Sequence, residues 1–595
     1  MLPKGLFGIV SSVAIDYDEL RRSLNALLDE DEYYESQSNT ACTGIVGVIC
    51  SSRYPYVKCI STSPDHSQIG AIDGSSFHGS RLDTKPHRLL DRDLALPDEA
   101  NGMFAAAAWN GERLKLLVDP LASTPLYYRW DERCFAFSSS LATLLAIDIF
   151  AAPAHSERSL AQYLCWGKVL GGGTLYHGVH KMQAAEFVDF AFSDHNPTKK
   201  KYWRPRIQTN GDGAALNRTV DAFAASVDSV MRTLPAPIAV SLSGGYDSRT
   251  ILAVLLAGKK PFVSVTHGMA DGFDTRIAQS LAKEHGLDHR MLWIDGAFSE
   301  SYPLYAKECV LRSNGMMSLE NAHLPFVYAA HTAYAHSIVD GISTFLERNF
   351  GLRRRAKDGS SKDEFFNAVW DYLIGDRERT VAKLENGEKV IQIAKEDLYN
   401  LLPACVDLSD PEALADTFYL EQIIANHATD GVCLQQHYNR FMTPYYELGY
   451  INELSKLSAR KRSANIPQRA IMKRFTPSLR WRARSYSDIR TLPVSQFHMQ
   501  LLPVAFDRLL HRITPLIRRL WRRSSLDYAQ YRSADLLLST ALREISAQRS
   551  SQLAPLLEDQ AVTDDPELLR SLLPLLMFNG ALGGIPPVRV RSIRP

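Results

Sequence analysis

An apolar run near the middle of the chain passes through a double-glycine turn into a second apolar segment, which restricts the fold to a few architectures. The residues are PIAVSL, the turn SGGYDS and then RTILAVLLAG. The first run is typical of a buried strand, and a segment that is apolar on nearly all sides predicts a buried helix. A second strand, PFVSVTHG, and a helix ending near Gly286 follow. This order predicts a parallel sheet covered by helices on both faces.

The turn between that first strand and helix has the chemistry of a phosphate site. Gly244 and Gly245 let the backbone approach an oxyanion closely, and the N–H groups and dipole of the helix favour a bound phosphate. Ser243 and Ser248 add hydroxyl groups. Asp247 would repel phosphate, so its presence is best explained by a Mg²⁺ ion that bridges the phosphates. A glycine turn with an Asp/Ser helix cap is the plain structural alternative.

The first ~200 residues have a different texture, with short apolar runs separated by turns. The runs are GLFGIV, GIVGVIC, FAAAAW, RLKLLV and CFAF, and the turns include Asp73-Gly74 and Asn110-Gly111. The segment DELRRSLNALLDE has the apolar spacing of a helix. We therefore expect a sheet-rich domain layered with helices, which ends near NPTKKKYWRP. Beyond residue ~360 the pattern predicts mainly helix.

Composition excludes several classes of protein. A formal net charge of +1 over 595 residues argues against binding of nucleic acid by the whole protein. The eight cysteines show no metal-ligand spacing. No stretch approaches the ~20 apolar residues that span a bilayer, and the apolar part of MLPKGLFGIVSS is short for a secretion signal. We expect a cytoplasmic protein with no transmembrane segment.

Several separated segments resemble the asparagine synthetase family. SGGYDS resembles the SGG-x-DS signature of ATP-pyrophosphatases, and the absence of G-x-x-x-x-G-K-[ST] excludes a P-loop kinase. NGMFAAAAWNGERLKLLVDPLASTPLYY, CFAFSSSLATLL and KKYWRP are similar to segments of the family in the same order. The resemblance extends from about residue 5 to about residue 493 and implies three parts. They are a degenerate glutaminase-like domain (1–205), an ATP-pyrophosphatase domain (206–495) and a helical extension (496–595).

The resemblance also implies a fold and an activity. The first domain is expected to be an Ntn-hydrolase-like αββα sandwich, and the second an adenine-nucleotide α-hydrolase-like (PP-loop) domain with a helical C-terminal part. The family adenylates a carboxylate with ATP, releases pyrophosphate and lets an amine attack the acyl-AMP. The expected cofactors are ATP and Mg²⁺. Ser243, Gly244, Gly245, Asp247 and Ser248 would then bind the phosphates of ATP, and Asp247 also the metal.

The glutaminase part departs from the family, whose nucleophile is a cysteine directly after the initiator methionine. Here the residue before the first strand is Lys4 or Gly5. The segment AIDGSSFHG places Asp73 where the family has an oxyanion-binding Asn, and a carboxylate there would repel an oxyanion. Both differences predict that glutamine is not hydrolysed. A rival hypothesis is that cleavage exposes Cys42 of CTGIVGV as an N-terminal nucleophile.

The synthetase part departs as well. The family's acidic loop corresponds to VDGISTFLERNFG, where Asp340, followed by Gly341, is the expected second Mg²⁺ ligand and Glu347 a reserve; a plain Asp-Gly turn is the alternative. RAIMKRFTPSL resembles the segment with the catalytic lysine. Arg469 stands at the lysine position and Lys473 one turn later on the same helix face. We expect one of these cations to contact the leaving phosphate, the alternative being two surface charges.

The substrate and partners are less determined by the sequence. A small carboxylic acid or a peptide is the expected substrate, with a homodimer and a precursor peptide as further expected partners. Two alternatives stay open: an intramolecular cyclase of the lasso-peptide or β-lactam type, and a non-catalytic regulatory protein on a decayed synthetase fold. Arginine-rich segments at 353–357 and 508–525 would suit an acidic partner or a membrane surface, or form packing helices with a solvated basic face.

Overall fold

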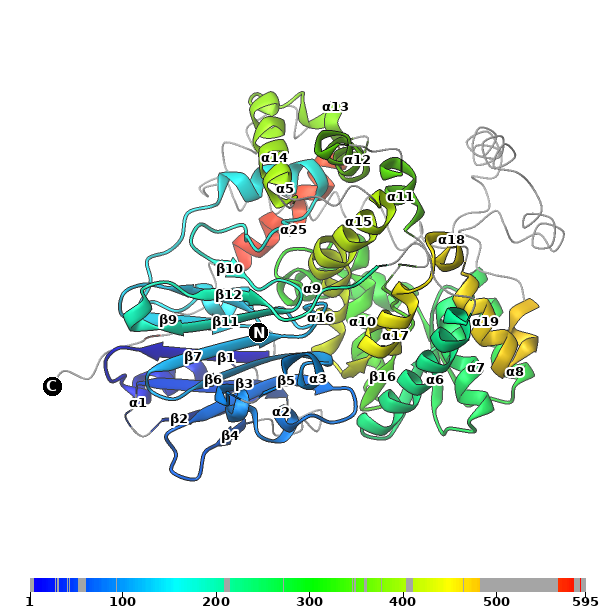
Figure 1. Ribbon diagram of the computed structural model, residues 1–595, viewed down its shortest axis with the longest axis horizontal. Coiled ribbons are helices and arrows are strands. Elements are labelled where there is room, and N and C mark those ends of the chain that lie inside the picture. The colour runs from blue at the N-terminus through cyan, green and yellow to red at the C-terminus, as the bar shows by residue number, and fades with distance from the viewer. Residues whose placement is uncertain are drawn as a thin grey trace.

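The computed structural model describes most of the chain from residue 5 to residue 481, and one helix near the end (Figure 1). The described residues are 5–26, 28, 32–39, 41, 43–51, 60–92, 94–207, 214–270, 272–344, 346, 349–357, 361–375, 377–402, 410–463, 465–481, 566–582 and 589. Lys4, Cys42, Glu347 and the basic segment 508–525 lie outside them. The predicted mixed α/β class is confirmed, with stacked sheets at one side of Figure 1 and a parallel sheet among helices at the other.

Two antiparallel six-stranded sheets form the amino-terminal half. The first has the order β10-β8-β9-β1-β3-β2 and the second the order β12-β11-β7-β6-β5-β4. The strands of the first sheet are β1 (Gly5–Ser11), β2 (Glu32–Ser38), β3 (Gly44–Ser51), β8 (Tyr127–Trp130), β9 (Cys134–Ser138) and β10 (His180–Lys181). Those of the second are β4 (Ile60–Thr62), β5 (Ile69–Ser76), β6 (Gly102–Trp109), β7 (Arg113–Val118), β11 (Glu186–Ala191) and β12 (Thr198–Lys201).

The two sheets are stacked face to face, and helices cover their outer faces. Leu6 and Val10 of β1 share one buried cluster with Leu116 of β7 from the other sheet. Phe7 and Ile9, which alternate with them, pack instead among helices, as the two-residue period of a strand requires. Helices α1 (Tyr17–Asn25), α4 (Leu141–Leu145) and α5 (Glu157–Trp166) contribute to that side. On the other side lie α2 (Arg81–Thr84), η1 (Pro86–Leu90) and α3 (Leu96–Glu99). The expected αββα sandwich is therefore observed.

A five-stranded parallel sheet organises the second half. Its order is β15-β14-β13-β16-β17, so the chain begins at the central strand and proceeds outward in both directions. The strands are β13 (Ile238–Ser241), β14 (Val263–Gly268), β15 (His289–Trp293), β16 (Ser337–Val339) and β17 (Arg440–Met442). The helices around it are α6 (Ala215–Thr233), α7 (Tyr246–Ala257), α8 (Phe273–Glu284), α9 (Gly296–Arg312), α10 (His323–His331), α17 (Leu448–Ser455) and α19 (Ile466–Phe475). This arrangement confirms the predicted parallel sheet.

Helices dominate the remaining described residues, as predicted for the region beyond ~360. They are η3 (Leu319–Asn321), α11 (Phe350–Ala356), α12 (Lys362–Ile374), α13 (Arg377–Val381), α14 (Gly387–Leu401), α15 (Pro411–Phe418), the π-helical η4 (Tyr419–Ala428), α16 (Thr429–Gln436), η5 (Pro444–Tyr446), α18 (Ala459–Arg462), η6 (Pro477–Trp481) and α25 (Pro566–Leu582). Helix α25 packs against α9 and α5. No helix in the described part of the chain is long and apolar enough to cross a membrane.

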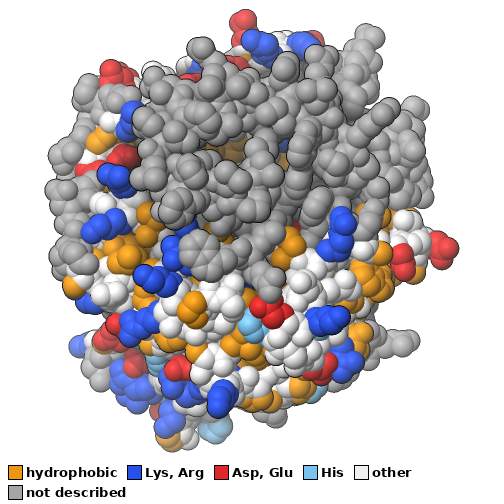
Figure 2. Space-filling model, turned by 90° about the vertical axis from the view of Figure 1, so that its right-hand side faces the viewer, with side chains coloured by type: hydrophobic (Ala, Val, Ile, Leu, Met, Phe, Trp, Pro, Cys, Tyr) orange, Lys and Arg blue, Asp and Glu red, His pale blue; other side chains and the backbone are white. Residues whose placement is uncertain are grey.

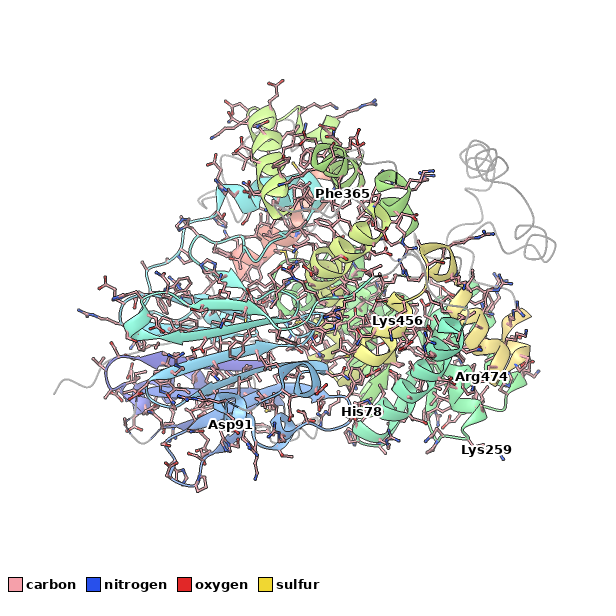
Figure 3. The ribbon with its side chains drawn as sticks, viewed as in Figure 1. His78, Asp91, Lys259, Phe365, Lys456 and Arg474 are labelled. Atoms are coloured by element: carbon pink, nitrogen blue, oxygen red, sulfur yellow. The ribbon has the colours of Figure 1, made fainter. Side chains whose placement is uncertain are left out.

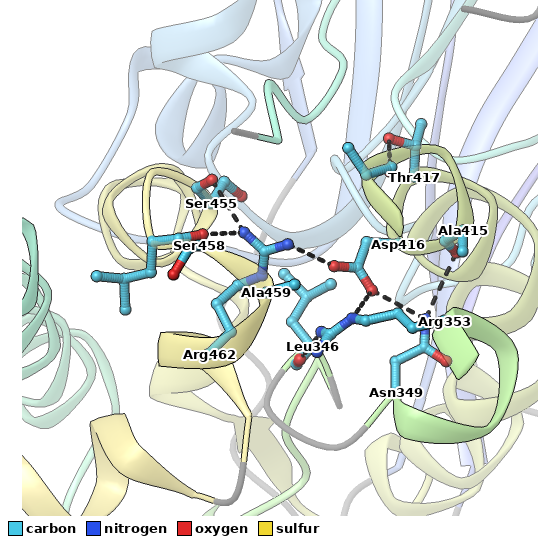
Figure 4. Close-up of polar contacts among 12 residues, drawn as sticks. Leu346, Asn349, Arg353, Ala415, Asp416, Thr417, Ser455, Ser458, Ala459 and Arg462 are labelled. Carbon is cyan, nitrogen blue, oxygen red and sulfur yellow. Dashed lines mark hydrogen bonds and ion pairs between the residues drawn. The ribbon is translucent and has the colours of Figure 1, made fainter. Parts of the chain in front are cut away.

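A buried charge cluster centred on Asp416 joins three of these helices (Figure 4). The Asp416 carboxylate is fully buried and accepts hydrogen bonds from Arg353 Nε at 2.6 Å, Arg462 Nη2 at 2.7 Å and Asn349 Nδ2 at 3.0 Å. Arg353 also donates to the Leu346 carbonyl, in the segment that follows β16. The arginine-rich segment 353–357 is thus not uniformly solvated, because Arg353 is buried as a structural ion-pair partner.

We expect Asp416→Ala to destabilise the fold strongly, because it leaves two arginines buried without their counter-ion. Breaking a buried ion pair from one side typically costs about 3–5 kcal/mol. The matched control is Asp221→Ala, which removes a surface pair with Arg474 at 2.8 Å and should cost at most about 1 kcal/mol. Arg474 is labelled at the outer edge of α19 in Figure 3. Urea denaturation of both variants checks this, and equal midpoints would contradict it.

The surface carries both signs of charge. On the face in Figure 2, described Lys and Arg side chains are interspersed with Asp and Glu. Surface ion pairs such as Arg218 with Glu453 and Lys260 with Asp228 also bring opposite charges together. Such mixing agrees with the formal net charge of +1.

Candidate nucleotide site

The double-glycine loop lies at the carboxyl end of the central strand. It connects β13 to α7, and Gly245 is the N-cap residue of α7 with extended backbone angles. The carboxyl ends of β14 and β16 lie on either side, because both strands run parallel to β13. Ligands of open α/β sheets bind at this edge, where the strand order reverses. The five predicted phosphate-binding residues therefore form one continuous turn at the expected edge of the sheet.

Hydrogen bonds within the loop hold its two serines together. The Ser243 N–H donates to Ser248 Oγ at 3.1 Å, and the two hydroxyl oxygens are 3.0 Å apart. The Gly245 N–H donates to Ser243 Oγ at 3.1 Å, while the Gly244 N–H donates to the Asp274 carboxylate at 2.9 Å. The Gly244 amide thus already binds a carboxylate oxygen, that of Asp274.

Asp274 was missed by reasoning from the sequence. It lies in the first turn of α8, the helix that follows β14. The signal was available, since the start of that helix must lie beside the loop when β14 pairs with β13. However, an acidic residue in a first helical turn is common for dipole reasons alone, so the pattern is weak.

Arg249, the residue after the motif, fixes the back of the loop. Its side chain is fully buried and donates to the carbonyls of Gly245 at 3.1 Å, Gly244 at 3.0 Å and Leu479 at 3.3 Å. Because the guanidinium engages both glycine carbonyls, the peptide groups are held with their N–H sides toward the opposite face. Arg249 is therefore a positioning residue for the loop.

Asp340, the residue predicted to be the second metal ligand, lies beside the loop. It directly follows β16, whose Val339 pairs with Val240 of β13. A Cβ built on Gly341 would lie 2.8 Å from the Ser248 nitrogen and 3.1 Å from the Asp247 Cβ, so the two segments are in van der Waals contact. Burial raises the pKa of Asp340, and hydrogen bonds from the Ser241 side chain and nearby backbone amides partly oppose this.

The chemistry of this pair fits Mg²⁺ bound together with a nucleotide. Mg²⁺ commonly uses one or two carboxylates and completes its coordination with phosphate oxygens and water. Asp247 and Asp340 supply the carboxylates. Within the described residues no group of three or more His, Cys, Asp or Glu side chains is arranged to hold a metal alone. A cation here would also offset the desolvation of Asp340.

Helix α19 packs across α7. Gln468 is buried and its Nε2 lies 3.3 Å from Asp247 Oδ1. Arg469, the next residue, is partly buried. Burial lowers the pKa of Arg480, and the nearby charge of Arg469 lowers it further. Lys473 is exposed in the last turn. Of the two predicted cations, Arg469 thus lies adjacent to a residue that contacts the loop.

Three histidines gather near the end of β14, and the sequence analysis did not single them out. The ring of His267 lies 6.1 Å from that of His323 and 6.4 Å from that of His331. Burial lowers the pKa of His267 to about 4 and, with the nearby His267, that of His331 to about 3. Both rings are therefore neutral at pH 7. Only the three-dimensional packing of α10 on the sheet brings them together.

The start of β1, where the resemblance to the family would place a glutaminase nucleophile, is crowded. A Cβ built on Gly5, the first residue of β1, would lie 2.7 Å from the Ser139 Cβ and 3.1 Å from Asp73 Oδ2. Gly5 also has a φ of +138°, which side chains rarely adopt. Asp73, which the sequence analysis aligned with an oxyanion-binding Asn, therefore lies beside the start of β1. Lys4 and Cys42 lie outside the described residues.

Comparison with known families assigns a domain to each half. Residues 94–203 match the glutamine amidotransferase domain family, and residues 219–304 match the asparagine synthase family. The second match contains the whole Ser243–Ser248 loop and Asp274. The first contains β6 to β12 of the stacked sheets.

A putative glutamine-hydrolysing asparagine synthetase of Methanocaldococcus jannaschii is 26% identical over 161 residues. The match covers 26% of this chain and 31% of that protein, so it spans about a third of its relative. Among solved structures, glutamine phosphoribosylpyrophosphate amidotransferase from B. subtilis aligns with 49% of this chain and 81% of its own, at 10% identity and a TM-score of 0.23.

Proposed function

Since this chain is a member of the asparagine synthetase family, we propose that it is a carbon–nitrogen ligase that activates a carboxylate with ATP. The observation that carries the proposal is the geometry at the end of β13. There the loop bearing Asp247 packs directly against the segment bearing Asp340. An anion-binding turn next to two carboxylates suits a metal-bound polyphosphate better than a bare phosphate.

In the proposed reaction the substrate carboxylate attacks the α-phosphorus of ATP and pyrophosphate leaves. An amine then attacks the resulting acyl-AMP, loses a proton and displaces AMP, which forms the amide. The loop amides and the Ser243 and Ser248 hydroxyls would orient the departing pyrophosphate. Mg²⁺ on Asp247 and Asp340 would neutralise its charge when bound. Such catalysis consists mainly of positioning and charge stabilisation.

The source of the amine decides between the family's activities. The crowded start of β1 and the nearby Asp73 carboxylate argue against ammonia released from glutamine. We therefore favour an amine that arrives as free ammonia or as part of a substrate. The second case includes intramolecular cyclases, with a small carboxylic acid or a peptide as substrate. A non-catalytic role on the same fold is the remaining alternative, and ATP turnover distinguishes it.

We expect the protein to convert ATP to AMP and pyrophosphate when it is given a suitable acid. Asp247→Asn should reduce ATP–pyrophosphate exchange by at least about a hundredfold, because it weakens metal coordination next to the transferred group. Asp221→Asn, at an exposed ion pair on α6, is the matched control and should leave exchange unchanged. Formation of ADP and phosphate would show the proposal to be wrong.

We expect no glutamate release from glutamine by the purified protein. The reason is the missing cysteine nucleophile together with Asp73 at the proposed oxyanion position. N-terminal sequencing of the same sample shows whether processing has exposed Cys42. Glutaminase activity that disappears in Cys42→Ala, and persists in the control Cys50→Ala within β3, would overturn this prediction.

We expect Arg469→Met to reduce turnover about a hundredfold, equivalent to about 3 kcal/mol in the transition state. Its neighbour Gln468 contacts Asp247, so this part of α19 faces the loop. Lys473→Met is the comparison on the same helix, and its exposure predicts the smaller effect. A larger loss in Lys473→Met would assign the role to that lysine. Near-normal turnover in both would remove this helix from the site.

A further inference from the structure

A cavity of ≈ 460 Å³ lies apart from the nucleotide loop, where the two halves of the chain meet. Its walls come from the end of α5, the 316–321 segment after α9, the start of α13, η4 and α25. Figure 1 shows α5, α13 and α25 converging in this region. The volume is in the range of sites for small organic molecules. Five segments that are distant in sequence thus enclose one space that the proposed ligase reaction does not use.

The cavity carries both signs of charge on different elements. Lys168 follows α5 and Arg377 begins α13, whereas Glu320 lies in η3. Lys168 is mostly buried, and its ammonium pairs with Asp430 at 3.5 Å. A Cβ built on Gly167 would lie 3.1 Å from Arg377 Nη1, so the guanidinium packs over the turn that leads to Lys168. Two cations therefore share one side of the cavity.

The remaining walls include apolar and sulfur-containing side chains. Trp166 and Tyr163 of α5, Met316 and Met317, and Pro574 of α25 line the space. Trp166 is held edge-on by Trp370 of α12, with ring centroids 5.9 Å apart. Aromatic rings and thioethers accommodate hydrocarbon side chains of variable shape. The lining of the cavity therefore combines apolar side chains with positive and negative groups.

One wall of the cavity is connected to the end of β14 through a histidine. The Nδ1 of His323 lies 3.2 Å from the backbone carbonyl of Glu320, and the His323 ring faces His267 at the end of β14. His323 therefore connects the Glu320 backbone to the end of β14. None of the residues that line the cavity belongs to the Ser243–Ser248 loop.

We propose that this cavity is a binding site for a free α-amino acid with an apolar side chain. Its carboxylate binds at Lys168 and Arg377, its ammonium at Glu320, and its side chain between Trp166 and Met317. Charge-assisted hydrogen bonds at both ends give selectivity for a zwitterion. The proposal does not depend on the ligase reaction, because binding at this site requires neither ATP nor Asp247.

The test is isothermal titration calorimetry of the full-length protein without ATP. The first probes are leucine, methionine and phenylalanine, and at least one should bind. For the one that binds, its N-acetyl derivative keeps only the carboxylate and its amide keeps only the ammonium. We expect each derivative to bind about tenfold more weakly than the parent amino acid, the order of one charge-assisted hydrogen bond. Absence of binding by all three amino acids at millimolar concentration would overturn the proposal.

Two variants assign the ends of the ligand. Arg377→Gln should weaken binding of the parent amino acid about tenfold, so that it binds no more tightly than its amide. In the Glu320→Gln variant, the parent amino acid should bind no more tightly than its N-acetyl derivative. The matched controls are Arg379→Gln on α13 and Glu300→Gln on α9, which change exposed residues. Their affinity for the amino acid should stay within twofold of that of the original protein. Equal effects of Arg377→Gln and Arg379→Gln would refute the assignment. Asp247→Asn should bind the amino acid normally, which separates this test from that of the ligase.

Discussion

The close approach of two backbone segments at the centre of the parallel sheet determines the candidate nucleotide site. Strands β13 and β16 pair in register, and the residues that follow them meet with little room between them. A side chain at Gly341 would come within 2.8 Å of the Ser248 nitrogen, so a glycine is needed there. This contact brings Asp340 beside Asp247 although 93 residues separate them in the chain. The acidic pair is therefore a consequence of strand order, and any change that separates these strands would also separate the carboxylates.

Buried arginines hold both partners of this contact in place. Arg249 fixes the glycine loop from behind, through the carbonyls of Gly244 and Gly245. Arg353 binds Asp416 and the carbonyl of Leu346, and so attaches the segment after Asp340 to the helical region. A guanidinium suits this role because it stays charged when buried and presents several N–H donors in a rigid plane. In both cases an arginine side chain, and not regular secondary structure, anchors the segment.

Local patterns in the sequence were sufficient to predict the helices, the strands and the loop. They were not sufficient to predict which distant residues contact them. The alternation in β1 and the strand–loop–helix unit around Gly245 depend only on neighbouring residues, and the observed fold contains both. Arg353 looked like one of several surface charges, because the sequence does not show that Asp416 is buried beside it. Asp274 and the histidines were missed for the same reason: their relation to the loop exists only after the strands have paired. Such contacts require the register of the sheet, which no short motif contains.

The stacked-sheet half contributes to the nucleotide site even though the start of its first strand is crowded. Strand β17 is the edge of the parallel sheet, and an uncovered edge invites non-native pairing. The amino-terminal half covers it: Arg440 donates to Ser75, and the Thr443 N–H points to the Met103 sulfur at 3.4 Å. Thr443 then donates through its hydroxyl to the Ile342 carbonyl, and two residues later the Tyr445 hydroxyl donates to the Asp247 carbonyl. The same short segment therefore contacts both backbone stretches that carry the acidic pair. Removal of the amino-terminal half would therefore expose the edge strand and release the segment that contacts the backbone of Ile342 and Asp247.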